Sequence, residues 1–422
     1  MFQLPGNVKK IIALFNEAGY EAYAVGGCVR DTLLGKEPQD WDITTSATPE
    51  EMKQIFTKTI DTGIQHGTVT VRMGGESYEV TTYRIDGEYE DGRHPKQVQF
   101  TSNLREDLRR RDFTINAMAY SDGSGLVDMF EGEKDLAQRR IRAVGNPVER
   151  FSEDALRMLR AVRFAAQLGF SIDKETKDGI ALLAENLKQV SMERIHTELV
   201  KLLVSNHPEE IYTCYETGLL DWFFPELGEA IAREGEAATK ALLNNLRFCR
   251  ADKDLRFCLL FDFCNWREKN ISEMSSDMAT KVLRRLKLDG NTIRRTSHLL
   301  KFLRIEAGES EEVTPAEIRK YFSMVSMEHA EDIVYLKKVI YNQTELYLEK
   351  ELEAIQTYGY CTAIKELAVT GEDLLALGVE QGKGLGEYLK AALAYVLEQP
   401  DKNTKESLVQ FVQEKQKKDF RE

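Results

Sequence analysis

The sequence contains no long run of apolar residues. Of its 422 residues, 42% are hydrophobic and 30% charged, and no stretch approaches the roughly 20 apolar residues that a membrane-spanning helix needs. The first residues, MFQLPGNVKKIIALF, place a basic pair before a short apolar run, but they lack a small-residue cleavage site and continue as an amphipathic helical pattern. We therefore expect a soluble chain with neither a membrane partner nor a signal peptide.

Cysteine is scarce, and no two cysteines form a C-x-x-C pair. The six cysteines, several of them inside apolar helical runs, are Cys28, Cys214, Cys249, Cys258, Cys264 and Cys361. This pattern is typical of buried thiols in a reducing compartment. We expect a cytoplasmic protein with neither disulfides nor structural zinc.

The chain also lacks an excess of positive charge. Its net charge of −13 argues at first against a nucleic-acid partner, because Lys and Arg side chains supply most of the affinity for phosphates. Net charge averages over the whole surface, however, and the basic residues are clustered at 109–111, 284–287 and 294–295. An acidic total is therefore compatible with a local basic surface that binds RNA.

The pattern of apolar residues divides the chain into two parts. The first ~140 residues contain strand-like runs rich in Val, Thr and Tyr at 22–25, 42–45, 67–73 and 78–83. From about Ser152 the periodicity is helical to the C-terminus. The sequence predicts an α+β N-terminal domain followed by an all-α remainder, and the length predicts several domains.

A glycine pair follows the first strand-like run. Gly26 and Gly27 lead into Val29-Arg30-Asp31, where a strand would turn into a helix. Glycines let backbone amides approach an anion, and a helix N-terminus favours negative charge. The segment predicts a triphosphate site that includes Gly27 and Arg30, with a plain tight turn as the alternative.

Two aspartates follow, the first of them thirteen residues after Gly27. Asp40 and Asp42 project to the same side if they lie on a strand, because side-chain direction alternates with period two. Two carboxylates on one face can hold Mg²⁺ together with substrate phosphates, or they can be solvated surface residues. We predict that Asp40 and Asp42 are catalytic metal ligands. Glu79, on a later strand-like run, is either a third carboxylate or an exposed strand residue.

The segment Arg110-Arg111-Asp112-Phe113-Thr114-Ile115-Asn116-Ala117 joins positive charge to an Asp and an Asn. The guanidinium of Arg111 suits a triphosphate, and Asp or Asn side chains can bind ribose hydroxyls. The alternative is a helix cap with solvated arginines.

Four charged residues then recur at every third position. Asp154, Arg157, Arg160 and Arg163 would form a ridge on a helix, and every residue between them is apolar. A solvated helix face normally carries other polar residues, so we predict a packed helix whose ridge faces a cleft. The alternative is a surface ion pair between Asp154 and Arg157.

The chemistry of Asp154 and Arg157 suits two of the four bases. Cytosine and adenine both present an amine donor beside a ring-nitrogen acceptor, so an aspartate can accept from the amine while an arginine donates to the nitrogen. Uracil and guanine present the opposite order. The pair therefore predicts selection of CTP and ATP over UTP and GTP.

These segments resemble the class II tRNA nucleotidyltransferases of the polymerase-β-like superfamily, which include the bacterial CCA-adding enzymes. The motifs GGCVRD, DWD, RRDFTINA, EDALRMLR and MERIHTEL occur in the family's order, as does the stretch from Asp135-Leu136 to Val144-Gly145. The resemblance implies a catalytic head at 1–140, a neck with the base template at 141–206, a body at 207–270 and a tRNA-binding tail at 271–422. It implies addition of CCA to tRNA from CTP and ATP, with Mg²⁺ as cofactor.

The resemblance also assigns roles to residues. Asp40 and Asp42 match metal ligands, and Asp154 and Arg157 match the template for the base. The remaining matches to nucleotide-binding positions are Gly27, Arg30, Arg111, Arg160 and Arg163.

Several alternatives stay open from sequence alone. A-adding and CC-adding enzymes and bacterial poly(A) polymerases share the head, although the segment 84–100 is similar to a loop that CC-adding enzymes lack and the C-terminus has only a short basic patch. A non-catalytic RNA-binding module is a fourth possibility, against which the intact acidic pair argues. The sequence also leaves open whether the chain forms a homodimer.

Overall fold

The computed structural model describes residues 2–87, 98–264, 271–305, 313–342 and 347–419. The chain divides into two compact units, Met1–Glu229 and Ala230–Glu422. Much of the segment 84–100, which is similar in sequence to a family loop, lies outside the described residues. Its two ends form a short antiparallel pair, β6 (Arg84–Asp86) with β7 (Val98–Phe100).

The first unit is built on a seven-stranded sheet with the order β3-β4-β5-β2-β1-β8-β9. The strands are β1 (Ala22–Val25), β2 (Ile43–Thr45), β3 (Thr59–Gly63), β4 (Thr68–Met73), β5 (Glu76–Thr82), β8 (Met118–Ser121) and β9 (Gly125–Asp128). Neighbouring strands are antiparallel except β2 and β5, which pair in parallel. The four predicted strand-like runs overlap β1, β2, β4 and β5, so the strands are confirmed, although the bounds of the last three differ by one or two residues.

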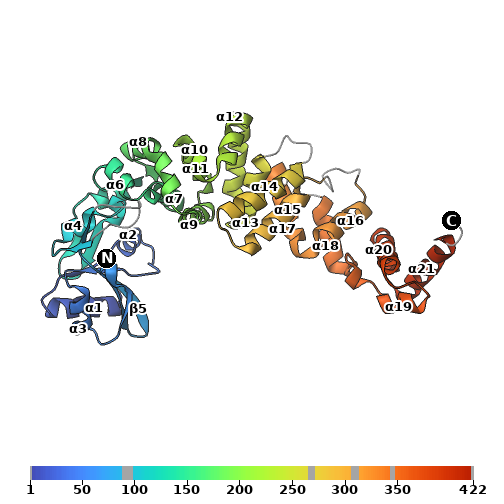
Figure 1. The fold of residues 1–422 in the computed structure, drawn as a ribbon, viewed down its shortest axis with the longest axis horizontal. Helices are drawn as coiled ribbons and strands as arrows, with labels where there is room; N and C mark the ends of the chain where they lie inside the picture. The colour runs from blue at the N-terminus through green and yellow to red at the C-terminus, as the bar shows by residue number, and fades with distance from the viewer. Residues whose placement is uncertain (1, 88–97, 265–270, 306–312, 343–346, 420–422) are drawn as a thin grey trace. The chain divides into compact units, whose positions relative to one another are not determined.

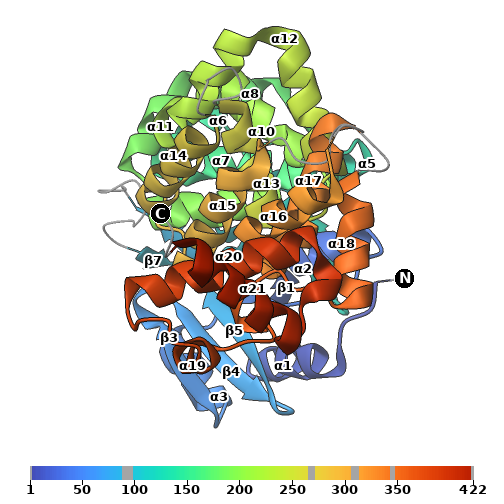
Figure 2. The same cartoon turned by 90° about the vertical axis from the view of Figure 1, so that its right-hand side faces the viewer.

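Helices flank this sheet and form the rest of the first unit. Helices α1 (Gly6–Glu17) and α3 (Pro49–Ile55) lie at one end of the unit and α8 (Lys174–Leu183) at the other in both Figure 1 and Figure 2. Thr48 and Glu51 form a capping box that starts α3. The remaining helices of the unit are α2 (Gly27–Leu33), α4 (Leu104–Arg109), α5 (Gly132–Ala137), α6 (Pro147–Glu153), α7 (Leu156–Leu168), α9 (Met192–Leu203), α10 (Ile211–Glu216) and α11 (Leu220–Phe223).

One short pairing departs from the helical pattern predicted after Ser152. The two-residue strand β11 (Ser171–Ile172) follows α7 and pairs in parallel with β10 (Arg140–Ile141). Apart from this pairing, the described residues after α6 form helices, turns and loops. The predicted class, an α+β domain followed by helices, is confirmed.

The second unit is helical throughout its described residues. Helix α12 (Pro225–Phe248) crosses the boundary between the units and is broken at Gly235, where φ is 79°. The helices that follow are α13 (Lys253–Cys264), α14 (Ile271–Arg285), α15 (Gly290–Leu303), α16 (Pro315–Val325), α17 (Met327–Tyr341), α18 (Tyr347–Tyr358), α19 (Gly371–Ala376), α20 (Lys383–Glu398) and α21 (Lys405–Asp419). Nearly every residue of α13 is buried, so this helix is a central element of the unit.

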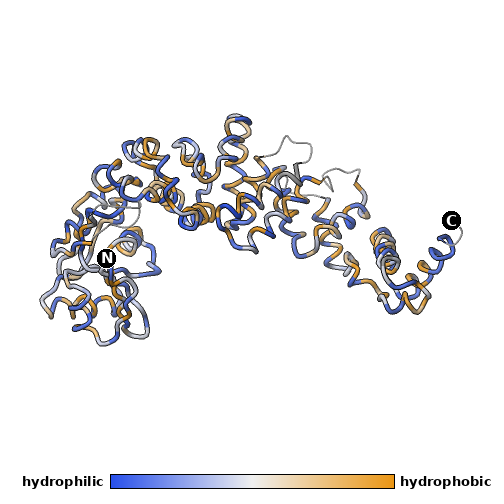
Figure 3. The backbone as a smooth tube through the Cα atoms, in the orientation of Figure 1, coloured by the Kyte–Doolittle hydropathy of each residue, from blue (hydrophilic) through white to orange (hydrophobic). Residues whose placement is uncertain are grey.

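Hydropathy follows the same plan in both units. Figure 3 shows hydrophilic and hydrophobic residues interleaved along the helices, as expected for helices that bury one face. No helix in the described part of the chain is long and apolar enough to cross a membrane. All six cysteines are buried, as predicted.

Candidate active site

The predicted glycine turn joins β1 to α2. Gly26 has φ 82° and ψ −130°, a conformation that L-residues with a side chain rarely adopt. A Cβ atom at Gly26 would lie 3.1 Å from Nη1 of Arg111. The turn therefore favours glycine, and a Cβ atom would also crowd the end of the Arg111 side chain.

The aspartate pair lies beside this turn, but not on a strand. Strand β2 begins at Ile43, so Asp40 and Asp42 occupy the extended segment that leads into it, and the prediction that the strand includes Asp42 is wrong by one residue. The Val25 N–H donates to the backbone oxygen of Asp42 over 3.0 Å. The parallel register of Ile43 with Val80 brings Asp42 next to Glu79 on β5.

The three carboxylates interact electrostatically. Loss of hydration raises the pKa of Asp42, although part of its surface is exposed; Arg111 opposes this rise, while the charges of Glu79 and Asp40 add to it. All three carboxylates line one open hollow of about 880 Å³. Among the described residues, no set of three or more His, Cys, Asp and Glu side chains is arranged to hold a metal ion. The charge that accumulates around Asp42 nevertheless fits a cation held by Asp40 and Asp42.

A second hollow, of about 490 Å³, also borders Asp42. Its wall combines the glycine turn with the two arginine-rich segments of the sequence. It is lined by Gly26, Gly27, Arg30, Asp42, Arg110, Arg111, Asp112, Asn116, Asp154, Arg157, Arg160, Arg163 and Phe164. We call this hollow the basic cleft. It contains every predicted site residue except Asp40, which lies in the adjacent hollow.

An alternating chain of charged and polar groups holds the arginines of the cleft. The Arg30 guanidinium donates to both oxygens of Asp31 (2.8 and 3.0 Å) and to Oδ1 of Asn116 (2.7 Å). Asn116 Nδ2 donates to Asp112 (3.1 Å), and Asp112 accepts from Arg160 (2.6 and 3.0 Å). Burial alone would raise the pKa of Asp112, but Arg160 and Asn116 outweigh it and lower that pKa to about 2.

Asp154 and Arg157, two residues of the predicted ridge, each bind a charged side chain outside the predicted pair. Helix α7 begins at Leu156, so Asp154 lies before the helix, in the junction between α6 and α7, and not on a continuous ridge. Asp154 binds Arg194 of α9 (2.7 Å), whereas Arg157 binds Glu153 (2.6 Å). The alternative of a surface ion pair between Asp154 and Arg157 is therefore not observed.

Helix α7 itself is packed as predicted. Most of its residues are buried, including Arg163. Arg163 donates to Glu198 on α9 over 2.6 Å, and burial lowers the pKa of Arg163 to about 10 although Glu198 opposes the change. Arg160 and Arg163 both line the cleft.

Four side chains that line the cleft or hold its charged residues had no specific role predicted from sequence. Asp107 is fully buried and accepts hydrogen bonds from Arg110 and Arg111, and Phe164 lies beneath three arginines of the cleft. The other two, Arg194 and Glu198, belong to the motif MERIHTEL, which contributes to the family resemblance but predicts no role for either residue. Their partners lie more than 30 residues away in the sequence, so spacing gave no signal for these contacts.

The second unit contains a basic hollow of its own. This hollow of about 830 Å³ lies around α14 and α15 and is lined by Asp254, Thr280, Arg284, Asn291, Ile293, Arg294, Arg295, Ser297, His298, Glu328 and His329. Arg295 is engaged by Asp252, Asp254 and Asp332, and Arg304 lies elsewhere in an ion pair with Asp262. Arg284 and Arg294 also line this hollow, and their side chains are exposed, so they can contact a phosphate here.

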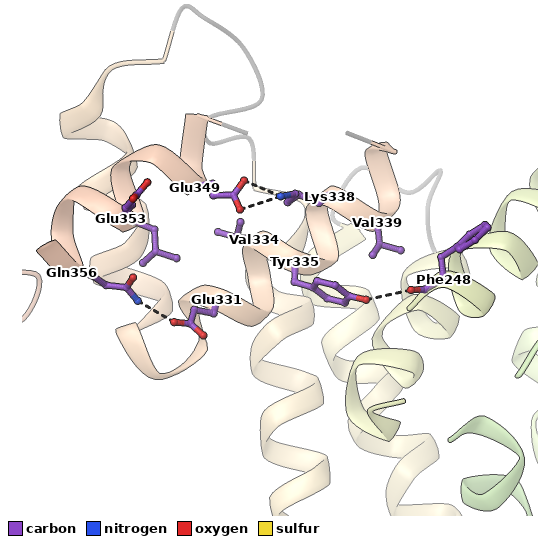
Figure 4. A pocket seen from close by; sticks show the side chains of 10 residues that line it. Phe248, Glu331, Val334, Tyr335, Lys338, Val339, Glu349, Glu353 and Gln356 are labelled. Atoms are coloured by element: carbon purple, nitrogen blue, oxygen red, sulfur yellow. Dashed lines mark hydrogen bonds and ion pairs between the residues drawn. The ribbon is translucent and has the colours of Figure 1, made fainter. Parts of the chain in front are cut away.

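Another hollow of the second unit is unsuited to an anion. Figure 4 shows it between α17, α18 and the end of α12, with Lys338 bound to both oxygens of Glu349 (2.9 and 3.0 Å). Glu331 and Glu353 also face this space, and Glu331 accepts from Gln356 (3.0 Å). Its charge is negative, whereas the basic cleft is lined by several arginines.

Three segments of the chain match known protein families. Residues 22–142 match the family "Poly A polymerase head domain", residues 169–231 match "Probable RNA and SrmB-binding site of polymerase A", and residues 270–412 match a tRNA nucleotidyltransferase domain 2.

Full-length relatives are similar across nearly the whole chain. The CCA-adding enzyme of Enterococcus faecalis is 38% identical over 97% of this chain and 95% of its own length, and that of Lactiplantibacillus plantarum is 37% identical over 97% of each. The crystal structure of the Bacillus stearothermophilus CCA-adding enzyme in complex with CTP has a TM-score of 0.78 and 31% identity, covering 98% of both chains.

Proposed function

This chain belongs to the class II CCA-adding enzymes and is a tRNA nucleotidyltransferase, and from that premise we propose that it builds and repairs the 3′-terminal CCA of tRNA, using CTP and ATP and releasing pyrophosphate. The observation that carries the proposal is the basic cleft, which combines a glycine turn, several arginines and the Asp154–Arg157 template segment beside an acidic pair. An RNA-binding module without catalysis would need no such combination. The full-length relatives are CCA-adding enzymes, which favours full CCA addition over CC-addition, A-addition or poly(A) synthesis.

The triphosphate is assigned to the arginine side of the cleft. Gly27 opens α2, where backbone N–H groups favour an anion, and Arg30, Arg111, Arg160 and Arg163 surround the same space. Their guanidiniums offer several fixed donors to phosphate oxygens. The carboxylates that hold these arginines keep their donors oriented before the nucleotide binds, so less ordering is required on binding.

The base is assigned to Asp154 and Arg157. Asp154 accepts from the exocyclic amine shared by cytosine and adenine, and Arg157 donates to the ring nitrogen beside it. Carbonyls of Arg110 and Arg150 accept from Arg157 (3.0 and 3.1 Å) and help to fix its plane. Because one pair of side chains reads both bases, no nucleic-acid template is needed to refuse UTP and GTP.

The metal is assigned to Asp40 and Asp42, with Mg²⁺ as the proposed ion. When bound, it would supply charge neutralisation of the triphosphate and activation of the attacking 3′ hydroxyl of tRNA. Asp42 borders both hollows, so it lies where the triphosphate and the tRNA end meet. Glu79 contributes charge to this site without being assigned as a ligand.

The tRNA body is assigned to the second unit, through Arg284 and Arg294. Both are exposed cations of a basic hollow, and phosphate contacts of this kind position RNA without reading its sequence. We further propose a cytoplasmic location and domain limits of 1–140, 141–206, 207–270 and 271–422. A homodimer is the oligomeric form to test, by light scattering of the purified chain.

One experiment tests the activity and its alternatives together. The purified chain is incubated with Mg²⁺ and tRNA that lacks its CCA end, in the presence of CTP alone, ATP alone or both. If the chain adds the full CCA, CTP alone should give addition of two C residues to the tRNA. A terminal A should follow only when CTP and ATP are both present. Addition of A alone, of C alone or of a long A tail would show one of the related activities instead of CCA addition. If no nucleotide is added, the alternative of a non-catalytic RNA-binding module is favoured.

A further inference from the structure

Helix α9 contributes two charged side chains to the back of the basic cleft. Arg194 and Glu198 lie one helical turn apart on α9, which packs against α7. Arg194 donates to Oδ2 of Asp154 over 2.7 Å, and Glu198 accepts from Arg163 over 2.6 Å. Neither Arg194 nor Glu198 lines the cleft, so each acts on its contents only through the residue it holds.

Asp154 is held by two contacts to its side chain, one from the start of α7 and one from α9. It lies in the junction between α6 and α7, with φ −142° and ψ 103°. Its Oδ1 accepts from the N–H of Leu156 over 3.1 Å, and its Oδ2 accepts from Arg194. Among the described residues, Arg194 is the one side chain that hydrogen-bonds this carboxylate.

These two contacts orient the carboxylate and leave it able to accept more. An ionised carboxylate has about four lone-pair sites, so each oxygen of Asp154 retains one for a further donor. With one oxygen fixed by backbone and the other by a guanidinium, the plane of the carboxylate is defined before a base arrives. Without the guanidinium, rotation about the side chain would let that plane adapt to a different base.

We propose that Arg194 is a positioning residue for nucleotide selection, which fixes the Asp154 carboxylate in the orientation that accepts the amine of cytosine and adenine. The inference rests on the proposed function, because it requires that Asp154 reads the base. Glu198 provides the contrast: it holds Arg163 and lies 3.6 Å from Arg160, both on the triphosphate side, which is common to all four nucleotides. Arg194 therefore governs which base is accepted, whereas Glu198 governs how tightly any nucleotide binds.

The test compares kcat/KM for CTP, ATP, UTP and GTP in variants of the full chain with tRNA acceptors. In Arg194→Ala, the preference for CTP over UTP and for ATP over GTP should fall about tenfold or more, the scale of one oriented contact to a base edge. Arg194→Lys should restore part of it, since a single ammonium can still reach Oδ2. Glu198→Gln should raise KM for all four nucleotides and keep the preference. Lys201→Ala, which removes an exposed cation from the same helix, should change neither quantity.

A double variant shows whether Arg194 acts through Asp154. Selectivity in Asp154→Ala/Arg194→Ala should equal that of Asp154→Ala alone, because Arg194 then has nothing to orient. Unchanged selectivity in Arg194→Ala, additive losses in the double variant, or an equal loss of selectivity in Glu198→Gln would each overturn the inference.

Two controls keep this result separate from other failures. If Arg194→Ala does not fold, as judged by thermal unfolding, Arg194→Gln replaces it and keeps the aliphatic stem. If Asp154→Ala retains full selectivity, the assignment of Asp154 as the base reader fails, and the inference fails with it. If CCA is not added by the unaltered chain, the proposed function fails before any variant is compared.

Discussion

At the scale of single residues, the basic cleft brings several like charges together around one aromatic ring. Arg30, Arg160 and Arg163 all approach the ring of Phe164, with guanidinium carbons 5.1, 5.3 and 3.6 Å from its centroid. The face of an aromatic ring attracts cations, by roughly 0.5 to 2 kcal/mol for each contact depending on hydration. Each of the three arginines also has a carboxylate partner. The ring and the carboxylates together offset the repulsion between the arginines and orient them for binding to phosphate.

Asp42→Asn should abolish nucleotide addition without unfolding the chain. We expect a loss larger than the roughly 10 to 100-fold typical of residues that only support a metal ligand, because an amide cannot balance the charge of a divalent cation. The raised pKa of Asp42 means that its ionised form costs stability in the metal-free chain at neutral pH, and this cost vanishes as pH falls and the carboxyl is protonated. In EDTA at pH 7, the variant should therefore unfold at a temperature no lower than the unaltered chain.

Primer-extension assays and thermal unfolding together check this prediction. Glu50→Gln, at an exposed position in the first turn of α3, serves as a comparison that removes one carboxylate without touching the acidic pair or the basic cleft. Near-normal turnover of Asp42→Asn would remove this residue from the mechanism.

Asp112 should make stability depend on pH in the opposite sense. Its pKa is about 2 in the folded chain, against an ordinary value of 3.8, so ionisation of Asp112 favours folding by about 2 kcal/mol. This stabilisation is complete above the ordinary value and is lost as pH falls from about 4 towards 2. Asp112→Asn removes it, so the difference in free energy of unfolding between the two proteins should shrink below pH 4. Urea unfolding at pH 7, 5, 4 and 3 measures it, and a difference independent of pH would contradict the assigned pKa.

Arg157→Ala should have a milder effect on base choice than removal of Asp154. The remaining carboxylate still accepts from an amine and still repels the carbonyl of uracil, so some discrimination persists. We expect kcat/KM for CTP and ATP to fall by about tenfold to a hundredfold, the range for one contact to a base edge. Incorporation of all four nucleotides measures this, and a full loss of discrimination would show that Arg157, not Asp154, does most of the reading.

At the scale of elements, the sequence predicted the parts whose signals are local. Alternation in YEVTT gave β5, with Tyr78, Val80 and Thr82 buried and Glu79 exposed. The start of α7 was harder to predict, because Asp154 fits the three-residue period of the helix although its backbone is extended. The contacts of Asp154 with Arg194 and of Arg163 with Glu198 depend on how α7 and α9 pack, which no spacing along the chain encodes.

The pair of helices α14 and α15 allows a prediction for tRNA binding. Replacing both Arg284 and Arg294 by Ala should weaken binding and lower the slope of log K against log salt by about one unit for each phosphate that is no longer bound, hence about two. Lys365→Ala/Lys390→Ala removes the same charge from exposed positions of the tail outside this hollow. The affinity for tRNA, measured between about 50 and 200 mM salt, distinguishes the two double variants. Equal slopes for the two double variants would mean that net charge, not this hollow, attracts the RNA.

At the scale of the whole molecule, net charge was a poor guide to the partner. The chain carries −13, yet its arginines are gathered in the basic cleft and around α14 and α15, while acids elsewhere surround hollows such as that in Figure 4. The division into a mixed head and a helical remainder followed from periodicity alone. The boundary between the two units did not, because it falls inside α12 and no glycine-rich or proline-rich linker marks it.

The position of that boundary decides how the two units can be separated. A cut near Lys269 looks natural in the sequence, but it would leave α13 with the first unit and without α14, α15 and α17, against which it packs. Nearly all of α13 is buried, so this fragment should aggregate. A fragment ending at Glu234, just before the break at Gly235, avoids that exposure and should remain monodisperse in gel filtration.

The fragment 1–234 should separate nucleotide recognition from tRNA binding. It contains the whole basic cleft and both aspartates, so calorimetry with CTP should give an affinity within about threefold of the full chain, since no residue lining the cleft is removed. It lacks Arg284 and Arg294, so its affinity for tRNA should be lower and its salt dependence shallower than those of the full chain. The full chain carrying Arg284→Ala and Arg294→Ala is the matched control, and its salt slope should approach that of the fragment. Equal tRNA affinity and equal slope for the fragment and the unaltered chain would show that the second unit contributes no phosphate contacts and that RNA is held by the head alone.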